Sequence, residues 1–185
     1  MENAYSVTTI NGDFCLKRND FPSIGISICL PDYLDNMREE EVNMLFPAFV
    51  RPTVSKTNTE YSISFMLKDV AIDMSQGLEA DALLLDSFVA QHKMLSRMVP
   101  GYREFGVNRK EIERHIVFCV EYMSYSLEDD LYNVFFTLAC GGKIIHGTFS
   151  CLAEKLHEMR MVFYMCLDTI QFSSTESTAQ HPAPN

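Results

Sequence analysis

Cysteine and histidine are the residue types here whose chemistry first suggests a reaction, because a thiol beside an imidazole base is a nucleophile. His115 and Cys119 are four residues apart in one predicted strand. They would face the same side of it but stand about 13 Å apart, at roughly 3.3 Å per residue, and cannot form a dyad directly. His146 is predicted in a hairpin strand from which it could approach Cys140. A Cys/His-dependent hydrolase therefore stays an alternative, with Cys119, Cys140 and Cys151 as the thiols to test.

The cysteines favour structural roles over a metal site. None of them forms a Cys-x-x-Cys pair, and a zinc site requires closely spaced ligand pairs. In a reducing compartment a buried cysteine behaves as a small apolar residue. The six cysteines, mostly in apolar strand or helix contexts, are Cys15, Cys29, Cys119, Cys140, Cys151 and Cys166. We interpret them as structural thiols and predict no metal and no cofactor.

The remaining histidines are placed on predicted helices. His157 and Arg160 lie with Glu154 and Glu158 in the last helix, where they are typical of a solvated helix face. His92 lies in an earlier long helix, where a partly buried and hydrogen-bonded histidine is commoner than a ligand. The sequence therefore predicts no catalytic residue in these helices.

Two short motifs could be mistaken for ligand sites. Gly141-Gly142 joins two strands and does not open a helix, so it lacks the arrangement of a phosphate-binding loop. The acidic run Glu39 to Glu41 could contact calcium or a partner. It is more typical of a helix start, where acidic residues suit the positive end of the helix dipole. We predict no catalytic, cofactor-binding or metal-binding residues, and the ligand- or partner-binding residues stay undetermined.

An antiparallel meander between Gly101 and Ser150 is the frame that positions most of these residues. Its apolar runs are rich in β-branched and aromatic residues, which favours strands. Gly141-Gly142 predicts a two-residue hairpin turn. The expected strands are Tyr102–Asn108, Glu113–Tyr125, Leu131–Cys140 and Lys143–Ser150. Both faces of the central strands are apolar, apart from Glu121, so we expect elements that cover both sides.

The rest of the chain supplies further strands and the covering helices. Alternation and turn residues predict strands at Ala4–Thr9, Asp13–Lys17, Ile24–Leu30 and Tyr61–Leu67, with a continuation at Val70–Ile72. Helical spacing predicts a short helix at Arg38–Phe46 and long helices at Leu78–Met98 and Leu152–Phe172, the last with Ser150 as its N-cap. The predicted fold class is thus α+β, an antiparallel sheet covered by two long helices in an α/β/α sandwich.

Length and composition indicate how many domains the chain forms and which classes of partner it can bind. The chain has 185 residues and is 47% hydrophobic, as in one globular domain. We predict that residues 1–172 form this domain and residues 173–185 a disordered C-terminal tail. The net charge of −10 argues against nucleic acid, because phosphate affinity depends on Lys and Arg. No signal peptide and no membrane-spanning run is recognisable, so we expect a cytoplasmic protein.

Two stretches resemble the PsbP-like family, with its Mog-type and DcrB-like relatives. Residues Ile26 to Tyr33, ISICLPDY, look like the early strand of that family, which ends in Pro-Asp and an aromatic. The hairpin through Gly141-Gly142-Lys143, running on to Ser150 and the last helix, is similar to its later half. The resemblance covers about residues 5–172. It implies an α/β/α sandwich and mostly non-enzymatic roles, and it carries over no site residue.

These observations predict a cytoplasmic protein-interaction or adaptor module that binds another polypeptide. A chaperone role linked to secretion is one form of this prediction, taken from the family resemblance. The alternative is a small-molecule or lipid-binding module. The 11 Met and 13 Phe suit an adaptable apolar cavity, and they suit a plain core equally well.

Overall fold

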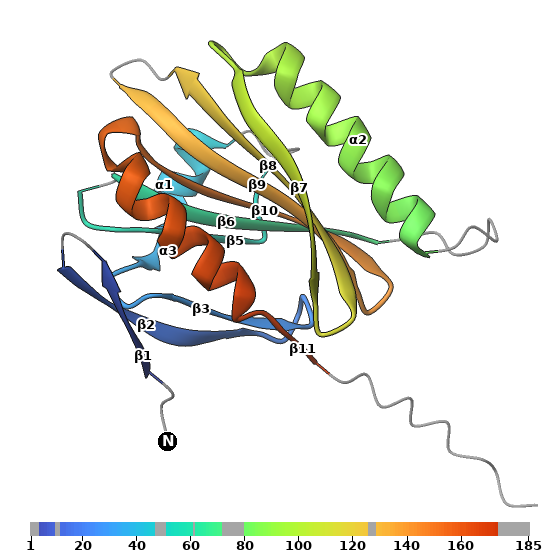
Figure 1. Cartoon of the computed structure of the whole chain (residues 1–185), viewed down its shortest axis with the longest axis horizontal. Helices are drawn as coiled ribbons and strands as arrows, with labels where there is room; N and C mark the ends of the chain where they lie inside the picture. The colour runs from blue at the N-terminus through green and yellow to red at the C-terminus, as the bar shows by residue number, and fades with distance from the viewer. Residues whose placement is uncertain are drawn as a thin grey trace, which may run out of the picture.

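The structure, a computed structural model, describes residues 4–9, 12–46, 51–60, 62–71, 80–125 and 129–173. Within these ranges it contains two antiparallel sheets and three α-helices (Figure 1). The strands are β1 (Ala4–Thr9), β2 (Gly12–Phe21), β3 (Ile26–Pro31), β4 (Asp35–Asn36), β5 (Val54–Thr57), β6 (Ile63–Ala71), β7 (Arg103–Ile112), β8 (His115–Tyr125), β9 (Asp130–Cys140), β10 (Lys143–Leu152) and β11 (Gln171–Phe172). The helices are α1 (Glu39–Leu45), α2 (Ala80–Met98) and α3 (Leu156–Asp168), with a 3-10 helix at Ala153–Lys155.

The larger sheet has seven strands in the order β4-β5-β6-β10-β9-β8-β7. The predicted meander is confirmed as β7 to β10, which pair antiparallel in chain order. Gly141 and Gly142 form the predicted two-residue turn, with φ angles of 57° and 73°. The β7–β8 turn instead places Glu113 and Arg114 at positive φ, which side chains other than glycine seldom adopt.

The smaller sheet has four strands in the order β1-β2-β3-β11. The prediction of one sheet is therefore wrong, because the N-terminal strands pair with each other and with β11 and do not join the meander. The short strands β4, β5 and β11 were not predicted, since two to four residues carry too little alternation to be recognised. β6 is one continuous strand where a main run and a continuation were expected.

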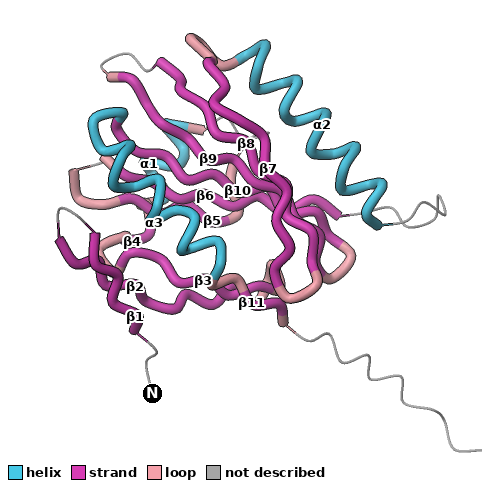
Figure 2. Tube along the Cα trace, viewed as in Figure 1, coloured by secondary structure: helices cyan, strands magenta, loops and turns pink. Residues whose placement is uncertain are grey.

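The arrangement of the layers differs from the predicted single sheet covered by two long helices. α2 packs on β8 and β9, whereas α3 packs against β10 and β3 (Figures 1 and 2). α3 and the small sheet share one face of the large sheet, and α2 covers only part of the other. The main core lies on the α3 side and includes the fully buried Phe65, Phe136, Phe149 and Phe163. A smaller cluster under α2 centres on Phe88.

The last predicted helix begins and ends differently from the prediction. β10 runs to Leu152, where it still pairs with Leu131, and α3 begins only at Leu156. Ser150 is therefore a strand residue and not an N-cap, and its hydroxyl donates to Asn133 Oδ1 at 2.7 Å. At the other end α3 stops at Asp168 and the chain continues as β11. The predicted tail from residue 174 onward, together with residues 10–11, 47–50, 61, 72–79 and 126–128, lies outside the described residues.

Candidate functional site

An open groove runs along the face of the large sheet that α2 covers only in part. Strand alternation places Met66 and Lys68 of β6 on this face, paired across the ladder with Thr148 and His146 of β10. All four side chains line one of the two hollows that border this face, and Met66 lines both. α1 stands along one side of the groove and α2 along the other. The two hollows share Phe46 and Met66, so they adjoin each other on this face, and together they are called the groove.

The α1 end of the groove is a hollow of about 780 Å³. α1 contributes Met44 and Leu45, whose exposures of 79% and 53% are large for apolar side chains. Leu131 of β9 lines the sheet side of the hollow. Its charged lining residues are Glu60, Asp129 and the Arg38–Glu41 ion pair. This end therefore combines exposed apolar surface with an excess of acidic side chains.

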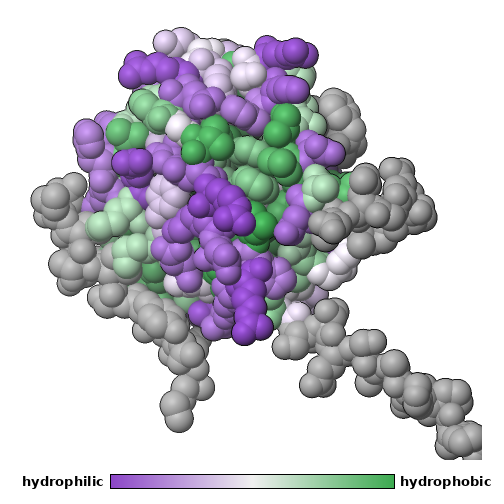
Figure 3. All heavy atoms as spheres, turned by 45° about the vertical axis from the view of Figure 1, so that its right-hand side comes forward, coloured by the Kyte–Doolittle hydropathy of each residue, from purple (hydrophilic) through white to green (hydrophobic). Residues whose placement is uncertain are grey.

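The α2 end is a smaller hollow of about 390 Å³. Its walls are mostly apolar, with Val70 from β6 and with Met94 and Leu95 from α2. Lys68 and His146 are among its few polar side chains. Figure 3 turns the α2 side of the molecule forward and shows apolar side chains gathered between hydrophilic strips.

His146 is held in this hollow by contacts on both ring nitrogens. Its Nε2 lies 3.3 Å from Ser87 Oγ of α2, and its Nδ1 lies 3.1 Å from Thr137 Oγ1 of β9. The ring stacks on Phe135 with centroids 5.7 Å apart. Burial, with the charge of Lys68 in addition, lowers the pKa of His146 to about 4. The imidazole is therefore neutral at physiological pH.

The thiols and imidazoles considered in the sequence each contact other groups in the structure. His115 stacks on Phe172, with centroids 3.6 Å apart, while Cys119 is fully buried and burial raises its pKa to about 12. Cys140 Sγ donates to Gly25 O at 3.2 Å, and burial raises the pKa of this thiol as well. A raised pKa keeps a thiol protonated and unreactive at neutral pH. This geometry offers no support to a thiol nucleophile.

The other residues singled out in the sequence have mostly structural contacts. His92 Nε2 lies 3.0 Å from Tyr102 Oη and 2.8 Å from Glu104 Oε2, so the prediction of a hydrogen-bonded histidine is confirmed. His157 is exposed on α3. Glu41 accepts a hydrogen bond from the Arg38 backbone at 2.9 Å, as expected of an acidic helix start. Among the described residues no group of three or more His, Cys, Asp or Glu is arranged to hold a metal ion.

Arg160 has a partner that the sequence did not indicate. It lies on an exposed helix face as expected, but its guanidinium also reaches β8 and pairs with the buried Glu121. Tyr132 and Tyr164 also donate to the Glu121 carboxylate, at 2.7 and 2.8 Å. Burial alone would raise the pKa of Glu121, but these hydrogen bonds outweigh it and the pKa is lowered. Its carboxylate is saturated with donors, so we assign this cluster to the attachment of α3.

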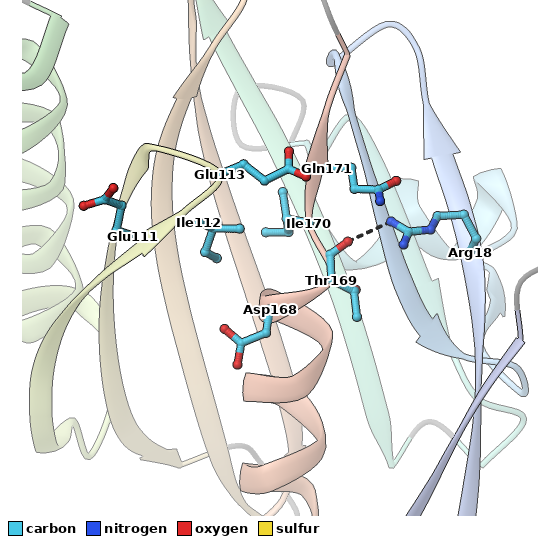
Figure 4. Close-up of a pocket in the computed structure, with 8 residues that line it drawn as sticks. All are labelled: Arg18, Glu111, Ile112, Glu113, Asp168, Thr169, Ile170 and Gln171. Carbon is cyan, nitrogen blue, oxygen red and sulfur yellow. Dashed lines mark hydrogen bonds between the residues drawn. The ribbon is translucent and has the colours of Figure 1, made fainter.

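A polar pocket lies at the C-terminal end of α3, next to the β7–β8 turn (Figure 4). Arg18 of β2 donates to Thr169 O at 2.7 Å, where it satisfies a carbonyl at the helix end. Asp168 pairs with Lys110 of β7 at 2.5 Å. Glu113 accepts a 3.4 Å hydrogen bond from the Phe172 backbone. These side chains join α3 and β11 to both sheets, and the pocket has a structural explanation.

No protein-family model and no curated protein matches the chain. Solved structures match its fold. Cyanobacterial PsbP (CyanoP) from Synechocystis sp. PCC 6803 has a TM-score of 0.59 and 11% identity, over 85% of this chain and 92% of that one. PA94 from Pseudomonas aeruginosa, a protein of unknown function and putative regulator, has a TM-score of 0.49 and 12% identity, over 92% and 99%. LpqN, involved in cell envelope biogenesis of Mycobacterium tuberculosis, has a TM-score of 0.48 and 9% identity, over 80% and 83%.

The fold comparison depends on the CyanoP structure, whose match covers 85% of this chain and 92% of that one. At this identity the likeness concerns the fold alone and transfers no site residue. The predicted resemblance to the PsbP-like family is confirmed at the level of the fold.

Proposed function

We propose that this protein is a non-enzymatic interaction module, an adaptor that binds an apolar segment of another polypeptide at the α1 end of the groove. The observation that carries the proposal is the exposure of Met44 and Leu45 beside an open hollow. Exposed apolar surface at a concave site, rimmed by polar groups, marks interaction surfaces more often than chance. Methionine side chains are flexible and polarisable, so Met44 and Met66 can adapt to different apolar partners.

The shape and charge of the groove indicate what would fit. Between Ser62 and Met66, the part of the floor that lines the α1 end, the chain extends about 13 Å at roughly 3.3 Å per residue, which would accommodate a helical segment of about nine residues at 1.5 Å each. Glu60 lines the α1 end, and its carboxylate would favour a basic residue, or the positive N-terminal end of a helix, at that end of the bound segment. The partner segment is thus apolar along its length with positive charge at one end.

A matched pair of variants tests this proposal on the full-length protein. The double variant Met44→Glu, Leu45→Glu places charge on the proposed surface, while Met98→Glu places it on an exposed position of α2 outside the groove. We expect wild type and the Met98 variant to retain one stoichiometric protein partner from a native lysate, and the double variant to lose it.

Titration with a synthetic peptide from the partner completes the test. Each apolar side chain buried in a site contributes roughly 1.5–3 kcal/mol, so the double variant should weaken peptide binding by at least about tenfold. Retention of the partner by the double variant, or its loss from the Met98 variant, would contradict this site. The cytoplasmic location and a chaperone role linked to secretion stay predictions. No helix among the described residues is long and apolar enough to cross a bilayer.

A further inference from the structure

We propose that the α2 end of the groove is a separate binding site for a small uncharged amphiphile, a molecule with an apolar body and one hydroxyl group. The hollow there has a volume of about 390 Å³, and small-molecule sites occupy roughly 300–1,000 Å³. Val70 of β6 and Met94 of α2 line it, and their exposures of 46% and 44% leave apolar surface for a ligand to cover. Met66, Leu95 and Phe135 extend this apolar lining.

The charged and titratable groups of the hollow disfavour a charged ligand. Among the described residues no aspartate or glutamate lines it, so a cationic ligand would find no opposite charge there. Lys68 would repel such a ligand, just as its charge disfavours the protonated form of His146. An anion would have to compete for Lys68, because this side chain is already engaged within the fold. Since burying an uncompensated charge is costly, an uncharged ligand loses least on leaving water.

Two polar side chains of the hollow are available to bind a hydroxyl group. They are Gln91 of α2 and Thr148 of β10, and neither side chain makes a hydrogen bond with the part of the protein that the structure describes. His146 differs from them, because both of its ring nitrogens already have partners. An amide and a hydroxyl can each donate and accept hydrogen bonds. They therefore suit a ligand hydroxyl, which also does both, better than a group that only donates or only accepts.

Gln91 and Thr148 lie beside each other because α2 and β10 run in the same general direction (Figure 1). Ser87 of α2 contacts His146 of β10, which fixes the position of the helix on the strand at that point. Gln91 follows Ser87 by about one helical turn, roughly 6 Å along the helix axis. Thr148 follows His146 by two strand residues, also roughly 6–7 Å. The two free polar groups thus line the hollow from opposite elements at about the same level.

Three probes with the same alkyl chain test the preference for an uncharged ligand on the full-length wild-type protein. They are octan-1-ol, octanoate and octylamine, the last as its ammonium ion, titrated by calorimetry at neutral pH. We expect octan-1-ol to bind at one site per chain, and the two ions to bind at least about tenfold more weakly because their charge must be desolvated. Backbone chemical-shift mapping should place the response to octan-1-ol at Val70, Gln91 and Met94, and not at Met44.

The double variant Gln91→Met, Thr148→Val tests the two polar groups, because it removes both of them and nearly keeps the side-chain volumes. A neutral hydrogen bond changes an affinity by roughly two- to tenfold. The double variant should therefore bind octan-1-ol about tenfold more weakly than the wild type. Gln171→Met is the matched control, since Gln171 is exposed on β11 and does not line the hollow. It should bind octan-1-ol as the wild type does.

Four results would overturn the proposal: no binding of octan-1-ol, binding of either ion as tight as that of octan-1-ol, a chemical-shift response outside this hollow, or equal affinities of the double variant and the Gln171 variant. The probe comparison and the mapping use the wild type, so they decide the question even if the double variant does not fold. Met44 and Leu45 line only the other hollow. The Met44→Glu, Leu45→Glu variant should therefore still bind octan-1-ol, and either proposal can fail without the other.

Discussion

The carboxylate of Glu121 in β8 is bonded at both oxygens by the guanidinium of Arg160 in α3. Arg160 Nε lies 2.7 Å from Oε2, and Nη2 lies 3.0 Å from Oε1. The two side chains differ sharply in exposure, because only 3% of the Glu121 side chain is accessible to solvent against 58% of the Arg160 side chain. The carboxylate therefore depends on its partners for stabilisation, whereas the guanidinium can be hydrated without them.

This asymmetry predicts that removing the exposed partner costs more stability than removing the buried one. Arg160→Met leaves a buried carboxylate without its cation, and breaking a buried pair in this way costs roughly 3–5 kcal/mol. Glu121→Gln keeps the shape and leaves a guanidinium that water can solvate, so we expect a smaller loss of about 1–3 kcal/mol. Urea unfolding measures both, with Arg97→Met on the exposed face of α2 as the control. A larger loss for the Glu121 variant would contradict this account.

The lowered pKa of Glu121 also predicts how the attachment of α3 depends on pH. The unfolded chain binds a proton at Glu121 at a higher pH than the folded chain does. The carboxylate therefore contributes its full stabilisation above the unfolded pKa, about 4.3, and this contribution is lost as the pH falls through the folded pKa. We expect the difference in unfolding free energy between wild type and Glu121→Gln to shrink below about pH 5. A difference that is constant from pH 7 to pH 3 would refute this.

His146 makes the stability of the fold depend on pH in a higher range than Glu121 does. Its folded pKa of about 4 lies below the ordinary value of 6.5, so the unfolded chain takes up a proton first as the pH falls. Wild-type stability should therefore decline from about pH 6.5 to pH 4, and His146→Gln should lack this part of the decline. Proton NMR of the imidazole C–H signals, assigned with the same variant, should show the His146 resonance titrating only near pH 4. Titration near pH 6.5 would contradict the burial of the ring against Ser87 and Thr137.

Sequence reasoning found the elements whose signals are local. The alternation in the meander strands and the turn at Gly141-Gly142 are visible within ten or so residues, and β8, β9 and β10 lie close to where the pattern placed them. Ser150 shows where such reasoning fails. A serine before a helical run is typical of an N-cap, but the pairing of β10 with β9 continues past it to Leu152. Tertiary pairing here outweighs the local preference.

The sequence pattern could not predict contacts between residues that lie far apart in the chain. Glu121 and Arg160 are 39 residues apart, and the sequence showed only that a single acidic residue interrupts an apolar strand face. That interruption was the one available signal for the partner in α3. The groove had no signal of its own, because it arises where α1 and α2 leave β6 and β10 uncovered. Met44 and Leu45 in a short helix look like core residues until the fold shows them exposed.

Gly147 offers a test of the packing in the centre of the large sheet. It pairs with Phe136 of β9, and a Cβ on Gly147 would overlap the aromatic ring of that phenylalanine. Phe136 is fully buried beside Phe149, with ring centroids 5.8 Å apart, so its ring has little room to move. Gly147→Ala should therefore destabilise the protein by roughly 1–3 kcal/mol through overpacking.

Gly106 provides the matched control for this prediction, since it lies at the bulge in the edge strand β7 and a Cβ there would meet no atom within 4 Å. Gly106→Ala should be nearly neutral in the same thermal or urea unfolding measurement. Trimming the opposing ring should rescue the variant, because Phe136→Leu removes the atoms that the new methyl group would meet. The double variant Gly147→Ala, Phe136→Leu should thus be less destabilised than the sum of the two single variants. Additive losses would show that Gly147 is required for some reason other than the close approach of Phe136.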